Sequence, residues 1–169
     1  DSQAHRIGEL AGLLPRPEQS LWYYSGVDRT QRTAQAVLSA MQYYGNPLIP
    51  HRGFREQDFG ELIGQKHEDI TKYLQFVDGK IYAPYPPEGE SIASFVVRTG
   101  NALDEVKQKA MEAEKNNIVV FCHGGTIRAA HIAIKKLDKS QFIALDTPPL
   151  FAYQHDINDH EALCRDQYE

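Results

Sequence analysis

The fold is decided by residues 118–128, which read Ile-Val-Val-Phe-Cys-His-Gly-Gly-Thr-Ile-Arg. The first half of this stretch is apolar and rich in β-branched residues, which is typical of a buried strand in a parallel sheet. A histidine and two glycines end the run, and an amphipathic helical pattern follows directly. The stretch therefore predicts a strand that places His123 at its carboxyl end, where a helix begins.

This junction has the chemistry of an anion site. Open α/β sheets bind ligands beyond the carboxyl ends of their strands. The first N–H groups of a helix are unpaired and favour an anion there. Gly124 and Gly125 would let the backbone approach a ligand closely, and an imidazole beside an anion suits phosphate chemistry. For this stretch alone, the alternative is a strand-end histidine whose hydrogen bonds are satisfied.

Length and composition indicate a single soluble domain over residues 1–169. Hydrophobic residues make up 41% of the chain and charged residues 24%, values that are ordinary for a globular protein. The net charge is −5 and no basic stripe is present, which argues against a nucleic-acid partner. Two cysteines, Cys122 and Cys164, fit neither a disulfide scaffold nor a metal site. No secretory signal or membrane-length apolar run occurs, so we expect a cytoplasmic protein with no membrane partner.

Hydrophobic periodicity predicts helices alternating with short strands, and therefore an α/β fold. Helices are expected over 4–14, 30–44, 67–76, 91–115 and from the two glycines to about 137. Strands are expected over 21–24, 48–50 and 118–122, with a last strand near 150–155. Ser91 is the expected cap of the long helix, and the stretches 51–64 and 78–89 are expected to be loop and turn.

A second patch, residues 25–34, contains an arginine where a helix starts. Arg29 follows a strand that ends at Ser25. A cation in the first turn of a helix opposes the helix dipole, which favours anions at that end. The conflict disappears if Arg29 shares its site with an anion, because the planar guanidinium suits phosphate. The alternative is a solvated surface arginine.

A third patch, residues 54–64, contains three acids in a glycine-punctuated loop. Glu56, Asp58 and Glu61 are all candidates for a general acid, which must be protonated when a leaving group departs. Their spacing does not choose among them.

Taken in chain order, these patches resemble the histidine phosphatase superfamily, which includes the cofactor-dependent phosphoglycerate mutases. Residues 25–34 are similar to its Ser-Pro-Leu-x-Arg-x-x-x-Thr-Ala segment, with Gly26 in place of proline. Residues 56–60 are similar to its Glu-x-x-Phe/Tyr-Gly segment, and 88–91 with the later Arg98 to its Gly-Glu-Ser pattern and arginine. Residues 123–128 match His-Gly-Gly-x-Ile-Arg, the most specific of the four.

The resemblance implies a three-layer α/β/α sandwich with a mostly parallel central sheet, and phosphoryl transfer through a phosphohistidine. It implies that His123 stabilises the transferring phosphoryl group, that Arg29 binds the phosphate and that Glu56 protonates the leaving oxygen. Phosphate binding is expected at Arg29, His123 and Gly124. Cations and in-line attack suffice for this chemistry, so no metal and no cofactor are expected.

The nucleophilic histidine of the family is missing. It belongs to an Arg-His-Gly triplet that ends the first strand, which would precede the helix at 4–14 and lie upstream of Asp1. His5 and His51 lie beside arginines, but in the wrong order and not after a buried strand. The N-terminal segment was left out of this sequence, or the protein is a degenerate member without chemistry, or it senses a phosphorylated ligand. We favour the first, because losing a central strand leaves buried backbone groups unpaired at roughly 1–3 kcal/mol each.

Within the family, the short stretch 65–88 resembles small phosphatases more than mutases, and Glu-Gln-Asp-Phe-Gly is similar to α-ribazole phosphatases. We therefore expect a phosphatase acting on a small phosphorylated metabolite, with a homodimer left open. The alternatives are an inactive phospho-ligand binding module and a phosphoglycerate mutase-type phosphotransferase. Tyr73, Tyr82 and Tyr85 either stack on an aromatic ligand or serve packing alone.

Overall fold

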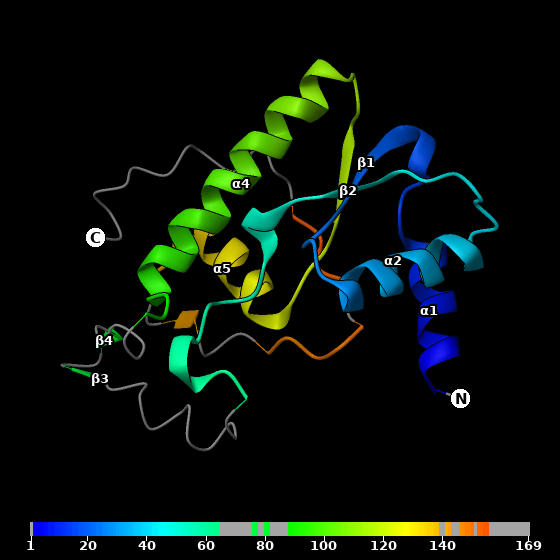
Figure 1. The fold of residues 1–169 in the computed structure, drawn as a ribbon. Helices are drawn as coiled ribbons and strands as arrows, with labels where there is room; N and C mark the ends of the chain where they lie inside the picture. Colours follow the sequence, from blue (N-terminus) through cyan, green and yellow to red (C-terminus); the bar gives the residue numbers. More distant parts are fainter. Residues whose placement is uncertain are drawn as a thin grey trace.

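The structure is a computed structural model that describes residues 2–64, 76–77, 80–81, 88–138, 141–142, 146–150 and 152–155. It is an α/β/α sandwich: two helices lie on each side of a parallel sheet (Figure 1). The main elements are α1 (Ser2–Leu13), β1 (Ser20–Tyr24), α2 (Asp28–Ala40), β2 (Leu48–Pro50), α4 (Ile92–Glu112), β5 (Asn117–Phe121) and α5 (Gly124–Lys135). Short 3₁₀ helices span Pro17–Gln19, Arg52–Phe54 and Gly60–Leu62, and β3 (Phe76–Val77) pairs antiparallel with β4 (Lys80–Ile81).

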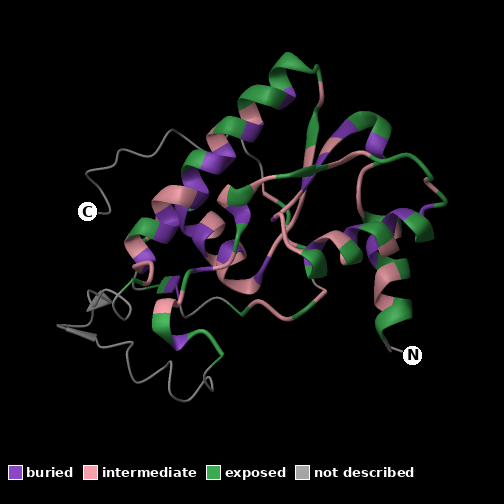
Figure 2. Ribbon diagram, in the orientation of Figure 1, coloured by how far each residue is buried: buried purple, intermediate pink, exposed green. Residues whose placement is uncertain are grey.

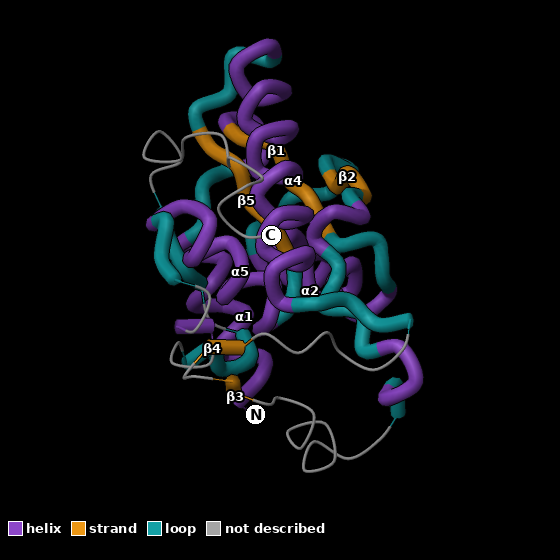
Figure 3. Tube along the Cα trace, turned by 90° about the vertical axis from the view of Figure 1, so that its left-hand side faces the viewer, coloured by secondary structure: helices purple, strands orange, loops and turns teal. Residues whose placement is uncertain are grey.

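The main sheet has the order β2-β1-β5, with both pairs of strands parallel. Trp22 of β1 lies opposite Leu48 on one side and Val119 on the other. Because the strands are parallel, their carboxyl ends meet at one edge, and the three strands lie side by side when the molecule is turned (Figure 3). The residues that follow β1 and β5 are Ser25 and the Cys122-His123 pair, so the sheet brings two of the sequence patches together.

The two faces of the sheet are covered by different helix pairs. Successive side chains of a strand point to opposite faces, and accordingly Trp22 and Tyr23, both fully buried, belong to different cores. Trp22 packs with Leu10 of α1 and Val37 of α2. Tyr23 belongs to the larger core that α4 and α5 fill, and buried and exposed residues alternate along α4 in Figure 2, as one buried face requires.

Most of the expected elements are present, but three helices end earlier than expected. We expected ends near 44, 115 and 137, and the helices end at Ala40, Glu112 and Lys135. Just past each end, Gln42, Glu114 and Lys136 adopt positive φ values of 56°, 53° and 51°. This left-handed conformation stops a helix and is usually supplied by glycine, which is the signal that sequence patterns use.

The prediction of a last strand near 150–155 was wrong. Residues 149–150 form a turn, and 152–155 have no regular structure. Pro148 and Pro149 precede this segment and lack the N–H that a sheet needs, while Leu150 takes a φ of 56°. The carbonyl of Leu150 instead accepts a hydrogen bond from Nε of Arg6 at 3.1 Å.

Two further expectations concern the segment after Gly64. Phe76, expected to end a helix, belongs to β3 instead. Lys80 and Ile81, which belong to the stretch expected to be turn, form β4. The remainder of the expected helix, 67–75, and the expected turn residues 78–79 and 82–87 lie outside the described residues. Ser91 is confirmed as the cap of α4, since its Oγ accepts from the Ser94 N–H at 3.0 Å. Within the described residues, no helix combines the length and the apolar character that crossing a membrane demands.

Candidate active site

The candidate site lies at the carboxyl ends of β1 and β5, around the first turn of α5. His123 follows β5 and is the N-cap residue of α5, with extended backbone angles. Its carbonyl accepts from the Ile127 N–H at 2.9 Å, which closes the first helical turn. The side chain is buried, with 8% of the residue exposed. The sequence prediction of a strand, a histidine and a helix is confirmed.

Arg29 and His123, predicted from separate patches, are in direct contact. Nδ1 of His123 accepts hydrogen bonds from Arg29, at 3.0 Å from Nη2 and 3.3 Å from Nε. On the other side of the ring, Nε2 lies 2.9 Å from Oγ of buried Ser25, and that oxygen lies 2.9 Å from Oγ1 of buried Thr30. The imidazole is therefore held between a charged group at the surface and two hydroxyls in the interior.

These surroundings keep His123 uncharged near neutral pH. Burial, and then the neighbouring Arg29 charge, lower its pKa to about 4. Arg29 itself is exposed to solvent, so an entering anion would meet its guanidinium and the Nδ1 edge of His123 together.

Glu56 is the acid that the fold turns toward this site. Its Oε2 accepts from the backbone N–H of Gly125 at 3.2 Å, and its Oε1 accepts from the Gln57 N–H at 3.0 Å. The carboxylate thus lies at the N-terminus of α5, where the helix dipole favours negative charge. A side chain on Gly125 would collide with this carboxylate, so the second glycine of the motif is what admits Glu56.

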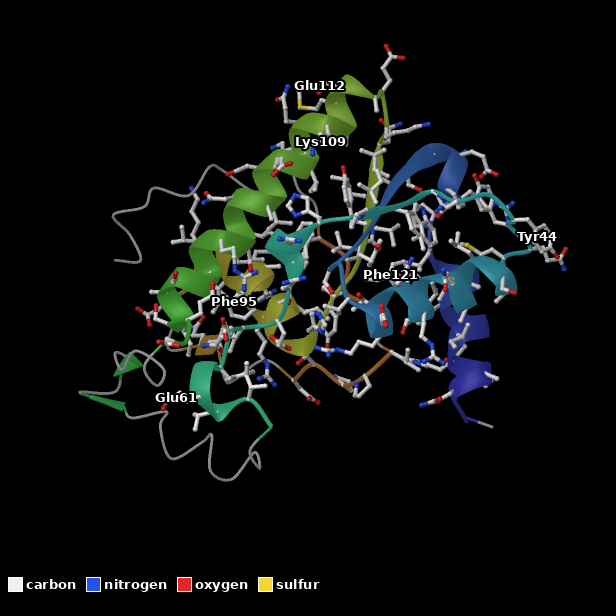
Figure 4. The ribbon with its side chains drawn as sticks, viewed as in Figure 1. Tyr44, Glu61, Phe95, Lys109, Glu112 and Phe121 are labelled. Atoms are coloured by element: carbon white, nitrogen blue, oxygen red, sulfur yellow. The ribbon has the colours of Figure 1, made fainter. Side chains whose placement is uncertain are left out.

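The other two acids have different environments. Oδ1 of exposed Asp58 accepts from the Gly60 N–H at 2.9 Å and so stabilises a turn. Glu61 is exposed on the Gly60–Leu62 helix, at the far end of this loop (Figure 4). Sequence spacing leaves the three acids equivalent, and the tertiary structure separates them.

The loop that carries Glu56 is held from α4. Arg98 donates to both carboxylate oxygens of Glu90, at 2.8 Å and 2.7 Å, and to the carbonyls of Gly53, Arg55 and Glu56 at 2.9, 3.2 and 3.4 Å. All five guanidinium N–H groups are used in this way. Its guanidinium also lies 4.8 Å from the ring centroid of Phe95, which Figure 4 labels on α4. The Gly-Glu-Ser pattern and the later arginine therefore form one structural unit, the Glu90–Arg98 clasp.

Gly124, the third predicted phosphate contact, lies against a residue that the sequence analysis missed. Oγ1 of Thr147 is 2.8 Å from the position that a Cβ on Gly124 would occupy. Ser25 and Thr30 were missed as well, although a small hydroxyl residue at a strand end is a usable signal for Ser25. Thr30 has no such signal, because its burial follows from packing.

The remaining candidates lie elsewhere or are inert. Burial raises the pKa of the half-buried Cys122 thiol to about 12, so it is not a nucleophile. His5 is exposed on α1 beside Glu9. His51 accepts from the Gly53 N–H through Nδ1, and its Nε2 lies 3.2 Å from Glu105. Among the described residues, no three metal-ligating side chains cluster.

Comparison with known proteins identifies the family of this chain. Residues 2–165 match the model of the histidine phosphatase superfamily, branch 1. Among curated proteins, the chain is 28% identical over 169 residues to phosphoglycerate mutase 2 of Gloeobacter violaceus, covering 92% of this chain and 73% of that enzyme. It is 30% identical over 141 residues to the mutase of Azorhizobium caulinodans, covering 80% and 67%. The match to the Bartonella quintana mutase is 27% identical and covers 72% of this chain, but only 61% of that enzyme's length.

Solved structures show the same fold. The mycobacterial glucosyl-3-phosphoglycerate phosphatase superposes with a TM-score of 0.64 at 22% identity, covering 86% of this chain and 71% of that one. A protein from Escherichia coli described as a putative alpha-ribazole-5'-P phosphatase superposes with a TM-score of 0.58 at 20% identity, covering 85% and 68%. With a phosphoglycerate mutase-like sandwich and a family match over nearly its whole length, the chain belongs to the histidine phosphatase superfamily.

Proposed function

We propose that this protein is a phosphatase that hydrolyses a small phosphate monoester through a phosphohistidine. The observation that carries the proposal is the meeting of Arg29, His123 and the carboxylate of Glu56 around the first turn of α5. The family's nucleophile, a histidine of an Arg-His-Gly triplet, has no counterpart in these 169 residues. In our proposal it is supplied by sequence upstream of Asp1.

In the first step, that histidine attacks the phosphorus in line with the ester oxygen. The N–P bond forms as the P–O bond breaks, and the electron pair leaves on the ester oxygen. Arg29 neutralises the charge on the equatorial oxygens. A phosphate dianion that draws the Arg29 donors away from Nδ1 lets His123 take up a proton from solvent at Nδ1, and the protonated Nδ1 then donates a hydrogen bond to the same phosphoryl group. In the second step, water attacks the phosphorus, the N–P bond breaks and phosphate leaves.

Glu56 is the proposed general acid. Protonated, it gives its proton to the departing ester oxygen, and as a carboxylate it can then accept a proton from the attacking water. The Gly125 N–H holds the carboxylate at the end of the helix, beside the residue that follows His123. Gly124, whose N–H also belongs to the first turn of α5, completes the proposed phosphate contacts.

The test is hydrolysis of p-nitrophenyl phosphate, in the presence of a chelator, by protein expressed from the complete gene. Arg29→Ala and His123→Ala are expected to lower kcat/KM by about 10²–10³-fold, the usual loss when a group that stabilises transition-state charge is removed. Arg32→Ala is the matched control, since Arg32 is an exposed arginine one turn further along α2. Equal losses in Arg29→Ala and Arg32→Ala, or no turnover by a protein that contains the Arg-His-Gly strand, would overturn the proposal.

The curated relatives favour a second candidate, a mutase-type phosphotransferase, because those named above are phosphoglycerate mutases. Incubation with 3-phosphoglycerate distinguishes the two activities. A phosphatase releases inorganic phosphate, whereas a mutase yields 2-phosphoglycerate without net release. Phosphate that raises the melting temperature of a protein showing neither activity would indicate the binding module instead.

A further inference from the structure

A chain of three hydrogen bonds, two of them buried and the one to Val27 partly buried, runs inward from His123 and has only one consistent arrangement of its hydrogens. Oγ1 of Thr30 lies 2.9 Å from the carbonyl oxygen of Val27, Oγ of Ser25 lies 2.9 Å from Oγ1 of Thr30, and Nε2 of His123 lies 2.9 Å from Oγ of Ser25. We call this the Thr30 relay. A carbonyl only accepts, and each hydroxyl has one hydrogen to give.

The hydrogens can therefore be assigned by counting. Thr30 must donate to Val27, so the Thr30 oxygen must accept from Ser25. Ser25 has then given its single hydrogen, so its oxygen must accept from His123. Nε2 of His123 consequently bears a proton.

The opposite side of the ring requires the same assignment independently. Arg29 can only donate, and it contacts Nδ1 through two nitrogens, at 3.0 Å and 3.3 Å. Nδ1 must therefore present a lone pair. Two sets of contacts, one in the interior and one at the surface, select the same neutral tautomer, with hydrogen on Nε2 and none on Nδ1.

The residue that ends the relay is not part of the family's sequence pattern. In the segment similar to Ser-Pro-Leu-x-Arg-x-x-x-Thr-Ala, Thr30 occupies an unspecified position, and Thr33 matches the threonine. Thr33 donates to the carbonyl of Arg29 at 2.9 Å, outside the relay. Thr30 is 4% exposed, so its hydroxyl has no bulk water to replace the Val27 carbonyl or the Ser25 hydroxyl.

We propose that Thr30 is a positioning residue that, through Ser25, fixes His123 as the Nε2–H tautomer and keeps Nδ1 directed at the anion site. The tautomer follows from contacts alone, whereas its use in phosphoryl transfer rests on the proposed function. Without the Thr30 oxygen, Ser25 is free to turn its hydrogen toward Nε2. That turn favours the Nδ1–H tautomer, which sets a hydrogen against the donors of Arg29.

The test reads the tautomer directly, by long-range ¹H–¹⁵N correlation at neutral pH on the protein labelled with ¹⁵N-histidine. His123→Gln identifies the signals of His123. The unaltered protein is expected to show an Nε2–H, neutral ring. Thr30→Val, which keeps the shape and removes the hydroxyl, is expected to give a mixture of tautomers, and Thr30→Ser is expected to restore the original one.

Thr33→Val is the matched control, because it removes a threonine hydroxyl from the same helix one turn away and should leave the His123 signals unchanged. An Nδ1–H ring in the unaltered protein would overturn the proposal, and so would an unchanged tautomer in folded Thr30→Val. If Thr30→Val does not fold, the unaltered protein and Thr30→Ser still test the proposal, since both must show the Nε2–H ring.

In the turnover assay, Thr30→Val is expected to lower kcat about tenfold with KM retained, the effect of one lost hydrogen bond that matters in the transition state. Because the tautomer is measured without substrate, a result against the tautomer proposal is distinguishable from a result against the proposed function.

Discussion

Replacing Arg98 with methionine should destabilise the protein substantially. The side chain of Arg98 is 30% exposed and that of its partner Glu90 only 14%. An exposed ion pair contributes at most about 1 kcal/mol, whereas removing one partner of a buried pair costs about 3–5 kcal/mol. The Glu90–Arg98 clasp lies between these cases, nearer the buried one, and three backbone carbonyls also lose a donor. We therefore expect a loss of about 2–3 kcal/mol in the free energy of unfolding.

For a chain of this size, that loss corresponds to a fall of about 4–12 °C in the melting temperature, measurable by circular dichroism. Lys109→Met is the matched control. It removes a cation from the same helix, where Figure 4 labels Lys109. The side chains of the Lys109–Glu105 ion pair are, however, 48% and 53% exposed. The Lys109 variant should melt at the temperature of the unaltered protein. Equal shifts in both variants, or a shift below 2 °C for Arg98→Met, would refute the reasoning from burial.

Two further predictions concern the site. Because the pKa of His123 is lowered to about 4, below its ordinary value of 6.5, the unfolded chain binds the proton more readily, and stability should fall as the pH drops from about 6.5 toward 4. Urea unfolding across that range measures the slope, which His123→Gln should reduce; an unchanged slope would contradict it. Gly125→Ala should displace the Glu56 carboxylate and slow turnover about 10²-fold or more if Glu56 is the acid. Gly12→Ala, where a Cβ has open space, is the control with normal turnover, and normal turnover in Gly125→Ala would show that Glu56 acts from elsewhere.

The sequence reveals the parts of the site that local pattern controls. The apolar run before His123 and the glycines after it predict the strand, the turn and the start of α5 because each follows from short-range periodicity and backbone freedom. The sequence predicts only that Arg29 and His123 belong to the same anion site. Their direct contact depends on the parallel pairing of β1 with β5, which the local pattern does not reveal.

What the sequence does not reveal depends on tertiary packing or on unusual backbone conformations. Glu56 is distinguished from its neighbouring acids by the N–H of Gly125, which lies 69 residues away in sequence. Thr30 matters through its burial, which no local pattern encodes. Left-handed non-glycine residues, Gln42, Glu114 and Lys136, follow the early helix ends, and a glycine-based rule does not find them.

The pairing of β1 with β5 also dictates when the site can come into existence. Ser20 of β1 lies opposite Asn117 of β5, a residue that comes 97 positions later in the sequence. A ribosome adds about 5–20 residues per second, so β1 emerges roughly 5–20 s before the strand it must join. Until then Trp22 and Tyr23 lack part of the cores that bury them. The site thus cannot assemble until β5 has been synthesised, and slow elongation between the two strands lengthens the interval in which chaperones can engage the unpaired β1 segment.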